Sequence, residues 1–275
     1  MPVSLLCRLA GLDVSLGALR WAAFPASTRQ LWFISDYLVL LLCVPLLNRL
    51  LRGLPRRAHK GVLLVLAVPL ILYPTLFGQD GILADTAWMF LYDYLLAAYL
   101  RRWPDNRLSQ FLNRPAAALA LGLGLPLANT AVRAVLEWQG AIDSKAFQYI
   151  AYYRTALGAL PGLLAALALF HFFKNWDLGS NRFVNALAGT TLGVYILHQV
   201  PVLRDFLWNG IVHAQAHHGS AGYTLLVIVL TFAGCAAIDA LRTKFIMQPL
   251  QRSRAFTALC AKGDVLAAEI AKPND

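Results

Sequence analysis

Charged residues are scarce in this sequence, and acidic ones most of all. There are 14 Asp and Glu residues against 24 Lys and Arg, and together they make up 14% of the 275 residues. Hydrophobic residues make up 59%, and the mean hydropathy is +0.57. Because about a quarter of the residues of a soluble domain are charged, this composition excludes an ordinary soluble domain. It indicates an integral membrane protein.

Cysteine is also sparse, and the residues Cys7, Cys43, Cys235 and Cys260 lie far apart with no C-x-x-C pair. We therefore expect neither a disulfide framework nor a metal site. The motifs G-x-x-x-x-G-K-[ST], H-E-x-x-H and G-x-S-x-G do not occur. Their absence excludes P-loop nucleotide hydrolysis, zinc proteolysis of that type and a nucleophile-elbow esterase.

Long apolar stretches dominate what is present, and none of them alternates with the period of two that a membrane β-strand shows. A spanning helix needs about 20 mostly apolar residues. Seven stretches qualify: Leu31–Leu51, Gly61–Phe77, Ala84–Leu100, Ala116–Glu137, Tyr149–Phe173, Val184–Trp208 and Tyr223–Leu241. We predict an all-α, polytopic bundle of about seven membrane helices.

Basic residues gather in alternate loops, and cytoplasmic loops are the ones that carry an excess of Lys and Arg. They follow the first, third, fifth and seventh stretches: Arg49, Arg52, Arg56, Arg57, Lys60, Arg101, Arg102, Arg107, Arg114, Lys174, Arg182, Arg242, Lys244, Arg252, Arg254, Lys262 and Lys272. The other loops between stretches hold Lys145 and Arg204. The pattern predicts an outside N-terminus and an inside C-terminus. It also explains the net charge of +10 without a nucleic-acid partner.

The start of the chain does not resemble a signal peptide that would export it. Its hydrophobic run is interrupted by Arg8, Asp13 and Arg20, and it lacks a small-residue cleavage site. We interpret residues 1–30 as an interfacial segment, residues 31–246 as the transmembrane domain and residues 247–275 as a cytoplasmic tail. An odd number of further spans before the first would reconcile the topology with the missing export signal.

One histidine, His198, lies inside an apolar stretch, where hydrocarbon penalises its side chain. Thr191, Tyr195 and His198 share one face of a helix because four and three residues separate them. His198 could act as a general base, since imidazole titrates near neutral pH. The alternative is a structural hydrogen bond to a neighbouring helix or to water.

Four charged residues fall in other stretches: Asp36, Asp93, Arg133 and Arg154. They could form ion pairs between helices, or they could line a water-filled cavity. The remaining histidines, such as His59 and His171, lie at or near loops, and we expect them to be solvated or interfacial.

Several segments, in this order, resemble the membrane-bound acyltransferase 3 family, in its branch similar to surface-polysaccharide O-acyltransferases. The opening LWFISDYLVLLLCVPLLN includes Trp32 and Asn48, and MFLYDYLLAAYLRRWP includes Arg101 and Arg102. The run NALAGTTLGVYILH ends at His198. The closing IDALRTKF contains Asp239 and Arg242.

This resemblance implies more helices than the chain contains. Family members typically have about ten spans with both termini inside, so about three N-terminal spans would be missing here. The family's catalytic histidine belongs to an Arg-x10-His pattern in the first span, and no such pattern occurs in this sequence. The chain could therefore be a truncated or inactive copy, or a partner could supply the missing helices.

The resemblance also implies an O-acyltransferase of the cell (inner) membrane, acting on a cell-surface polysaccharide or lipid-linked sugar. The acyl donor would be an acyl-CoA, expected to be acetyl-CoA, that acts as a substrate, and no cofactor would be bound. Its phosphates would meet Arg101, Arg102 or the loop Arg49–Lys60, although positive-inside bias alone also explains those charges. His198 would be the base or its orienter, Tyr195 or Arg154 would stabilise the oxyanion, and Trp32 would contact substrate. The alternative is a non-enzymatic transporter or flippase component, or a scaffold subunit.

Overall fold

A computed structural model describes residues 31–80, 83, 86–155, 159–177, 179–200, 204, 206–213 and 221–271. The predicted interfacial segment 1–30 lies outside these residues, and so does the side chain of Arg154. Throughout the described part the chain is helical, with turns between the helices and no strand. The prediction of an all-α membrane bundle is confirmed.

The described chain divides into two compact units. The central unit contains residues 36–178, and the C-terminal unit contains residues 179–272 together with the first residues of the helix α3. The central unit holds α3 (Trp32–Arg52), α4 (Arg56–Ala67), η1 (Val68–Leu72), α5 (Tyr73–Phe77), α6 (Thr86–Arg102), α7 (Arg107–Leu112), α8 (Pro115–Trp138), α9 (Lys145–Thr155) and α10 (Leu160–Lys174). The C-terminal unit holds α11 (Arg182–Gln199), η2 (Phe206–Ile211), α13 (Ala221–Arg242), η3 (Thr243–Met247), α14 (Gln248–Gln251) and α15 (Arg254–Ala271).

In the part of the chain that the structure describes, four continuous helices are long and apolar enough to cross a membrane: Trp32–Arg52, Arg56–Phe77, Pro115–Trp138 and Gly222–Gln251. Their side chains are mostly exposed in the isolated chain, and the exposed ones include Leu42, Val65, Leu127 and Leu225. Apolar surface on this scale requires lipid or another apolar partner. The hydropathy of these stretches therefore correctly predicted long helices with apolar surfaces.

The fifth predicted stretch, Tyr149–Phe173, is not one helix. It is divided between α9, which ends at Thr155, and α10, which begins at Leu160. Ala159 has an extended backbone, and Pro161 occupies the first turn of α10. Proline lacks the N–H that a helix interior needs, so it favours the start of a helix over its middle. The prediction of a single span was wrong here because it used hydropathy alone and did not consider that Pro161 favours a helix start.

The sixth predicted stretch, Val184–Trp208, is also interrupted. The helix α11 ends at Gln199, and Val200 takes an extended conformation. Val200 precedes a proline in the sequence, and such a residue is disfavoured in the helical region. A separate π-helical turn, η2, begins at Phe206.

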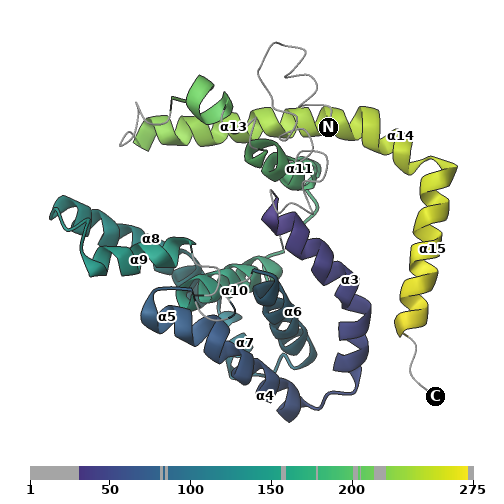
Figure 1. The fold of residues 1–275 in the computed structure, drawn as a ribbon, viewed down its shortest axis with the longest axis horizontal. Helices are drawn as coiled ribbons and strands as arrows, with labels where there is room; N and C mark the ends of the chain where they lie inside the picture. Colours follow the sequence, from purple (N-terminus) through teal and green to yellow (C-terminus); the bar gives the residue numbers. More distant parts are fainter. Residues whose placement is uncertain are drawn as a thin grey trace. The chain divides into compact units, whose positions relative to one another are not determined.

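The core of the central unit lies between α4, η1 and α6. Its buried residues are Leu63, Leu70, Ile71, Met89, Tyr92 and Leu95. A second contact joins α8 to α10, which lie side by side (Figure 1). There Gly122 leaves room for Leu169, whose Cδ2 would come within 2.7 Å of an added Cβ. Small residues of this kind let membrane helices approach closely.

The end of α5 is fixed by a tyrosine from α9. Gly78 closes α5 in the left-handed conformation, with φ of 62°, and its missing side chain leaves space for the Tyr149 ring. The Tyr149 hydroxyl donates to the carbonyl of Thr75 at 2.5 Å. Carbonyls in the last turn of a helix lack partners within it, so this hydrogen bond stabilises the end of α5.

Candidate functional site

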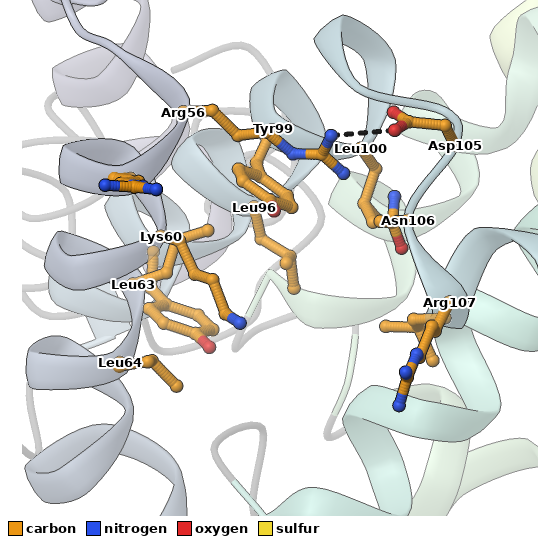
Figure 2. Close-up of a pocket in the computed structure, with 13 residues that line it drawn as sticks. Arg56, Lys60, Leu63, Leu64, Leu96, Tyr99, Leu100, Asp105, Asn106 and Arg107 are labelled. Atoms are coloured by element: carbon orange, nitrogen blue, oxygen red, sulfur yellow. Dashed lines mark hydrogen bonds and ion pairs between the residues drawn. The ribbon is translucent and has the colours of Figure 1, made fainter.

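A pocket of about 590 Å³ opens between α4, α6 and the start of α7. It lies at the end of these helices where the basic residues gather, which we call the basic end. Its lining is Arg56, Arg57, Lys60, Leu63, Leu64, Tyr92, Leu96, Tyr99, Leu100, Asp105, Asn106, Arg107 and Leu108. The pocket thus combines a cationic rim, two aromatic rings and an apolar floor (Figure 2).

The rim contains one ion pair and three further cations. The Arg56 guanidinium donates to the Asp105 carboxylate at 2.7 Å, and both side chains are partly exposed. Among the described residues, Arg57, Lys60 and Arg107 make no ion pair. Figure 2 shows Lys60 and Arg107 on opposite walls of the pocket. Two cations that face one opening from two elements can bind an anionic ligand between them.

Local structure explains how Arg107 reaches the pocket. Asn106 caps α7, because its side-chain oxygen accepts from the Ser109 N–H at 2.9 Å. Its amide nitrogen also donates to the Trp103 carbonyl at 2.7 Å. An N-cap with two such bonds fixes the turn between α6 and α7. Arg107 is therefore placed as the first residue of a rigidly started helix.

His59 lies buried behind the pocket, with 1% of its surface exposed. Its Nε2 is 3.0 Å from the Leu95 carbonyl oxygen, and because a carbonyl only accepts, Nε2 must carry the proton. Its ring makes edge-to-face contacts with Tyr99 and Trp103. The expectation of a solvated side chain was wrong for His59, and also for His171, which has 2% of its surface exposed. The available signal was helical spacing, because His59 lies four residues before the core residue Leu63.

The neighbouring arginines Arg101 and Arg102 have different surroundings. Arg102 donates to the carbonyls of Leu51 at 2.6 Å and Leu54 at 3.3 Å, and it lies over the Trp103 ring. It therefore stabilises the end of α3, where carbonyls need donors. Arg101 lines a second groove, between α3 and α6, and has no partner among the described residues.

The predicted catalytic residues lie together on α11 in the C-terminal unit. The ring centroids of Tyr195 and His198 are 6.1 Å apart, in an edge-to-face contact. The ring centroids of Phe33 and Tyr195 are 5.6 Å apart, and those of Trp32 and Phe33 are 6.0 Å apart. The structure therefore links Trp32, Tyr195 and His198 through Phe33, which the sequence did not single out as a site residue. We call these four residues the His198 cluster.

Hydrogen bonds orient the His198 ring. Its Nδ1 is 2.7 Å from the Val194 carbonyl oxygen, so Nδ1 carries the proton. Its Nε2 is then an acceptor, and the amide nitrogen of Gln199 lies 3.2 Å from it. This Nε2 lone pair can accept a proton from a substrate hydroxyl once the Gln199 amide has turned away from it. Thr191 shares the helix but bonds its own backbone, donating to the Ala188 carbonyl.

Close contact between α11 and α13 supports this cluster. Asp239 is buried, with 2% of its surface exposed, and it lies against Gly193. Arg242 donates to the Asp239 carboxylate at 2.8 Å. A side chain at position 193 would overlap this carboxylate, so glycine is required there. These residues come from two of the segments that carry the family resemblance.

Among the described residues, partners are seen for two of the four intramembrane charges. Asp36 accepts a hydrogen bond from Thr86. Arg133 bonds Glu137 on the same helix at 3.2 Å and lies over the Phe147 ring. Among the described residues, no group of three or more His, Cys, Asp or Glu side chains could hold a metal ion.

The described chain is thus an all-α membrane protein with a cationic pocket in its central unit and an oriented histidine in its C-terminal unit. A comparison with protein families then matches residues 3–240 to the acyltransferase domain of the acyltransferase 3 family. The chain belongs to that family and is an acyltransferase that transfers groups other than aminoacyl groups. Searches of curated proteins and of solved structures found no match.

Proposed function

We propose that this protein is an O-acyltransferase that moves an acyl group, most simply acetyl, from acyl-CoA to a sugar hydroxyl. The acceptor is a cell-surface polysaccharide or a lipid-linked sugar at the inner cell membrane. The basic end faces the cytoplasm, where acyl-CoA is available, and residues 247–275 form a cytoplasmic tail. The observation that carries the proposal is the pocket between α4, α6 and α7, in a chain of the acyltransferase 3 family.

The chemistry of this pocket suits the nucleotide part of acyl-CoA, and we call it the donor pocket. Lys60 and Arg107 are available for its phosphates, because no described residue neutralises them. The ring of Tyr99, which is less buried than that of Tyr92, offers aromatic surface for the adenine. A volume of about 590 Å³ falls within the range of small-molecule sites. Of the two basic groups proposed from sequence, we assign donor binding to the one that includes Lys60, since Arg102 already binds carbonyls of α3.

The reaction requires a base and an oxyanion donor. In the proposal, Nε2 of His198 accepts the proton of the sugar hydroxyl as its oxygen attacks the thioester carbonyl carbon. The Tyr195 hydroxyl donates to the developing oxyanion. The new C–O bond forms, the C–S bond breaks, and the thiolate of CoA leaves and takes the proton. Trp32, on the same aromatic cluster, provides a face for the sugar ring, and Arg154 remains a second candidate for the oxyanion.

The direct test is transfer of labelled acetyl from acetyl-CoA to glycans in membranes that contain the protein. We expect His198→Ala to lower the rate by about 10²- to 10⁴-fold, the usual contribution of a general base. Leu192→Ala changes an exposed side chain of the same helix and is the matched control. Equal label transfer by His198→Ala and the parent would exclude a catalytic role for His198. No transfer by the parent to any membrane glycan would overturn the proposed activity.

A further inference from the structure

A second groove, of about 640 Å³, lies on the opposite face of α6 from the donor pocket. It is lined by Asn48, Leu51, Arg52, Tyr94, Ala97, Ala98, Arg101 and Arg102. The two lining sets of α6 share no residue. At about 100° per residue, Tyr92, Leu96 and Tyr99 fall on one face, and Tyr94, Ala98 and Arg101 fall on the other. The second groove is therefore a separate site.

Polar contacts hold α3 and α6 beside this groove. Thr86 bonds Asp36 near the start of both helices. The Tyr94 hydroxyl donates to the Asn48 side-chain oxygen at 2.7 Å, and Arg102 bonds the Leu51 carbonyl at the basic end. Tyr94 and Arg102 reach α3 with long side chains, whereas Ala97 and Ala98 between them are short. The alanines leave the space between the helices unfilled, and a groove results.

The lining of the groove changes from apolar to cationic along its length. Its floor is formed by Leu51 and the two alanines, which offer only hydrocarbon. Arg52 and Arg101 stand at the basic end, and the guanidinium of Arg101 has no partner among the described residues. Arginine binds phosphate through two parallel hydrogen bonds. A phospholipid fits such a groove, because its acyl chain can lie on the apolar floor while its phosphate lies at the cationic end.

The surroundings also favour a lipid as the occupant. The helix α3 is long and apolar enough to span the membrane, and its exposed side chain Leu41 lies two helical turns before Asn48, on the face that lines the groove. A groove on such a helix opens toward the bilayer. Basic pockets between membrane helices at the cytoplasmic surface bind anionic headgroups.

We propose that this groove binds one anionic phospholipid of the leaflet at the basic end. The lipid phosphate contacts Arg101 and Arg52, and one acyl chain lies along Leu51, Ala97 and Ala98. The bound lipid fills the space that the polar contacts between α3 and α6 leave open. This site is distinct from the donor pocket, and it does not depend on the proposed function.

The test is lipid retention by the purified full-length protein, measured by native mass spectrometry with phosphatidylglycerol or phosphatidylcholine added. We expect preferential retention of phosphatidylglycerol, and a five- to tenfold loss of that retention in Arg101→Gln, about 1 kcal/mol. Arg254→Gln, which changes an exposed arginine of α15, is the control and should retain the lipid. Ala97→Leu fills the floor and should reduce retention of both lipids.

Binding of acetyl-CoA to the same variants separates this proposal from the donor site. Donor affinity should stay within twofold of the parent in Arg101→Gln, and this variant keeps the fold because Arg101 is exposed. Equal retention of both lipids, or unchanged phosphatidylglycerol retention in Arg101→Gln, would overturn the lipid site. Loss of acetyl-CoA binding in Arg101→Gln would also overturn it and would place the donor in this groove.

Discussion

Basic residues lie beside both faces of α6 at the same end of the helix, but the two faces differ in what surrounds those residues. On the face toward α4, the pocket has aromatic rings and cations from two elements, and one cation is already paired with Asp105. On the face toward α3, alanines form the floor and Arg102 binds backbone carbonyls. A count of positive charges at a helix end predicts membrane orientation. Only the neighbours of each charge indicate whether it binds a donor, a lipid or the chain itself.

Reversal of two charges in the donor pocket tests whether the two faces of α6 bind different ligands. We expect the Lys60→Glu and Arg107→Glu double variant to weaken acetyl-CoA binding by about 100-fold, since two charge-assisted contacts of more than 1 kcal/mol each become repulsive. The KM for acetyl-CoA in the transfer assay measures this loss. Phosphatidylglycerol retention should remain at the parent level. A parallel loss of both ligands would mean that the two faces form one site.

Removal of the His59 side chain should lower the stability of the folded protein. His59→Ala deletes a buried ring between Tyr99 and Trp103 and its bond to the Leu95 carbonyl. We expect a destabilisation of about 2–3 kcal/mol, the usual cost of a buried cavity with a lost hydrogen bond. Denaturant unfolding of the purified protein measures it. His59→Gln keeps a donor for the carbonyl and should lose less, and equal stability of His59→Ala and the parent would contradict the buried position.

Arg101 and Arg102 are adjacent on the face of α6 toward α3 but have different partners, so their variants can be compared directly. Arg102→Ala removes the donors to the end of α3, and we expect it to lower the unfolding free energy by about 1–2 kcal/mol, a discounted value because these bonds are partly exposed. Arg101→Ala should change it by less than about 0.5 kcal/mol, as for a surface residue without partners. The same unfolding experiment compares them. A reversed order would mean that Arg101, not Arg102, holds α3.

The smallest effect concerns the ion pair at the pocket rim. Asp105→Asn removes a negative charge and releases Arg56 for a phosphate, so the KM for acetyl-CoA should fall by about two- to threefold. Because the pair is exposed, the stability should stay close to that of the parent. High salt should reduce the difference from the parent. A rise in KM would instead show that the Asp105 carboxylate contacts the donor.

Much of the fold could be predicted from hydropathy, because lipid-facing helices need long apolar stretches whatever their neighbours are. The prediction failed where proline chemistry opposed hydropathy, before Pro161 and after Gln199. Helical spacing also placed Tyr195 and His198 on one face, and the structure brings them into contact. That prediction used residues on a single helix.

The donor pocket could not be predicted because it combines elements that are separate in the sequence. Lys60 and Arg107 face the same pocket only because α4 packs on α6 and because the Asn106 cap begins α7 beside that pocket. The burial of His59 likewise depends on Tyr99 and Trp103 from the neighbouring helix. Periodicity gives the face of a helix, but it does not identify the helix that covers that face.

The location of the donor is tested most directly by photocrosslinking with an azidoadenine derivative of acetyl-CoA, followed by mapping of the labelled peptides. The label should appear on α4, on α7 or on the face of α6 that carries Tyr92 and Tyr99, and excess acetyl-CoA should prevent it. The charge-reversed Lys60→Glu and Arg107→Glu protein should lose the label, and Arg101→Gln should keep it. Label confined to α3, or label that acetyl-CoA fails to displace, would contradict the assignment of this pocket to the donor.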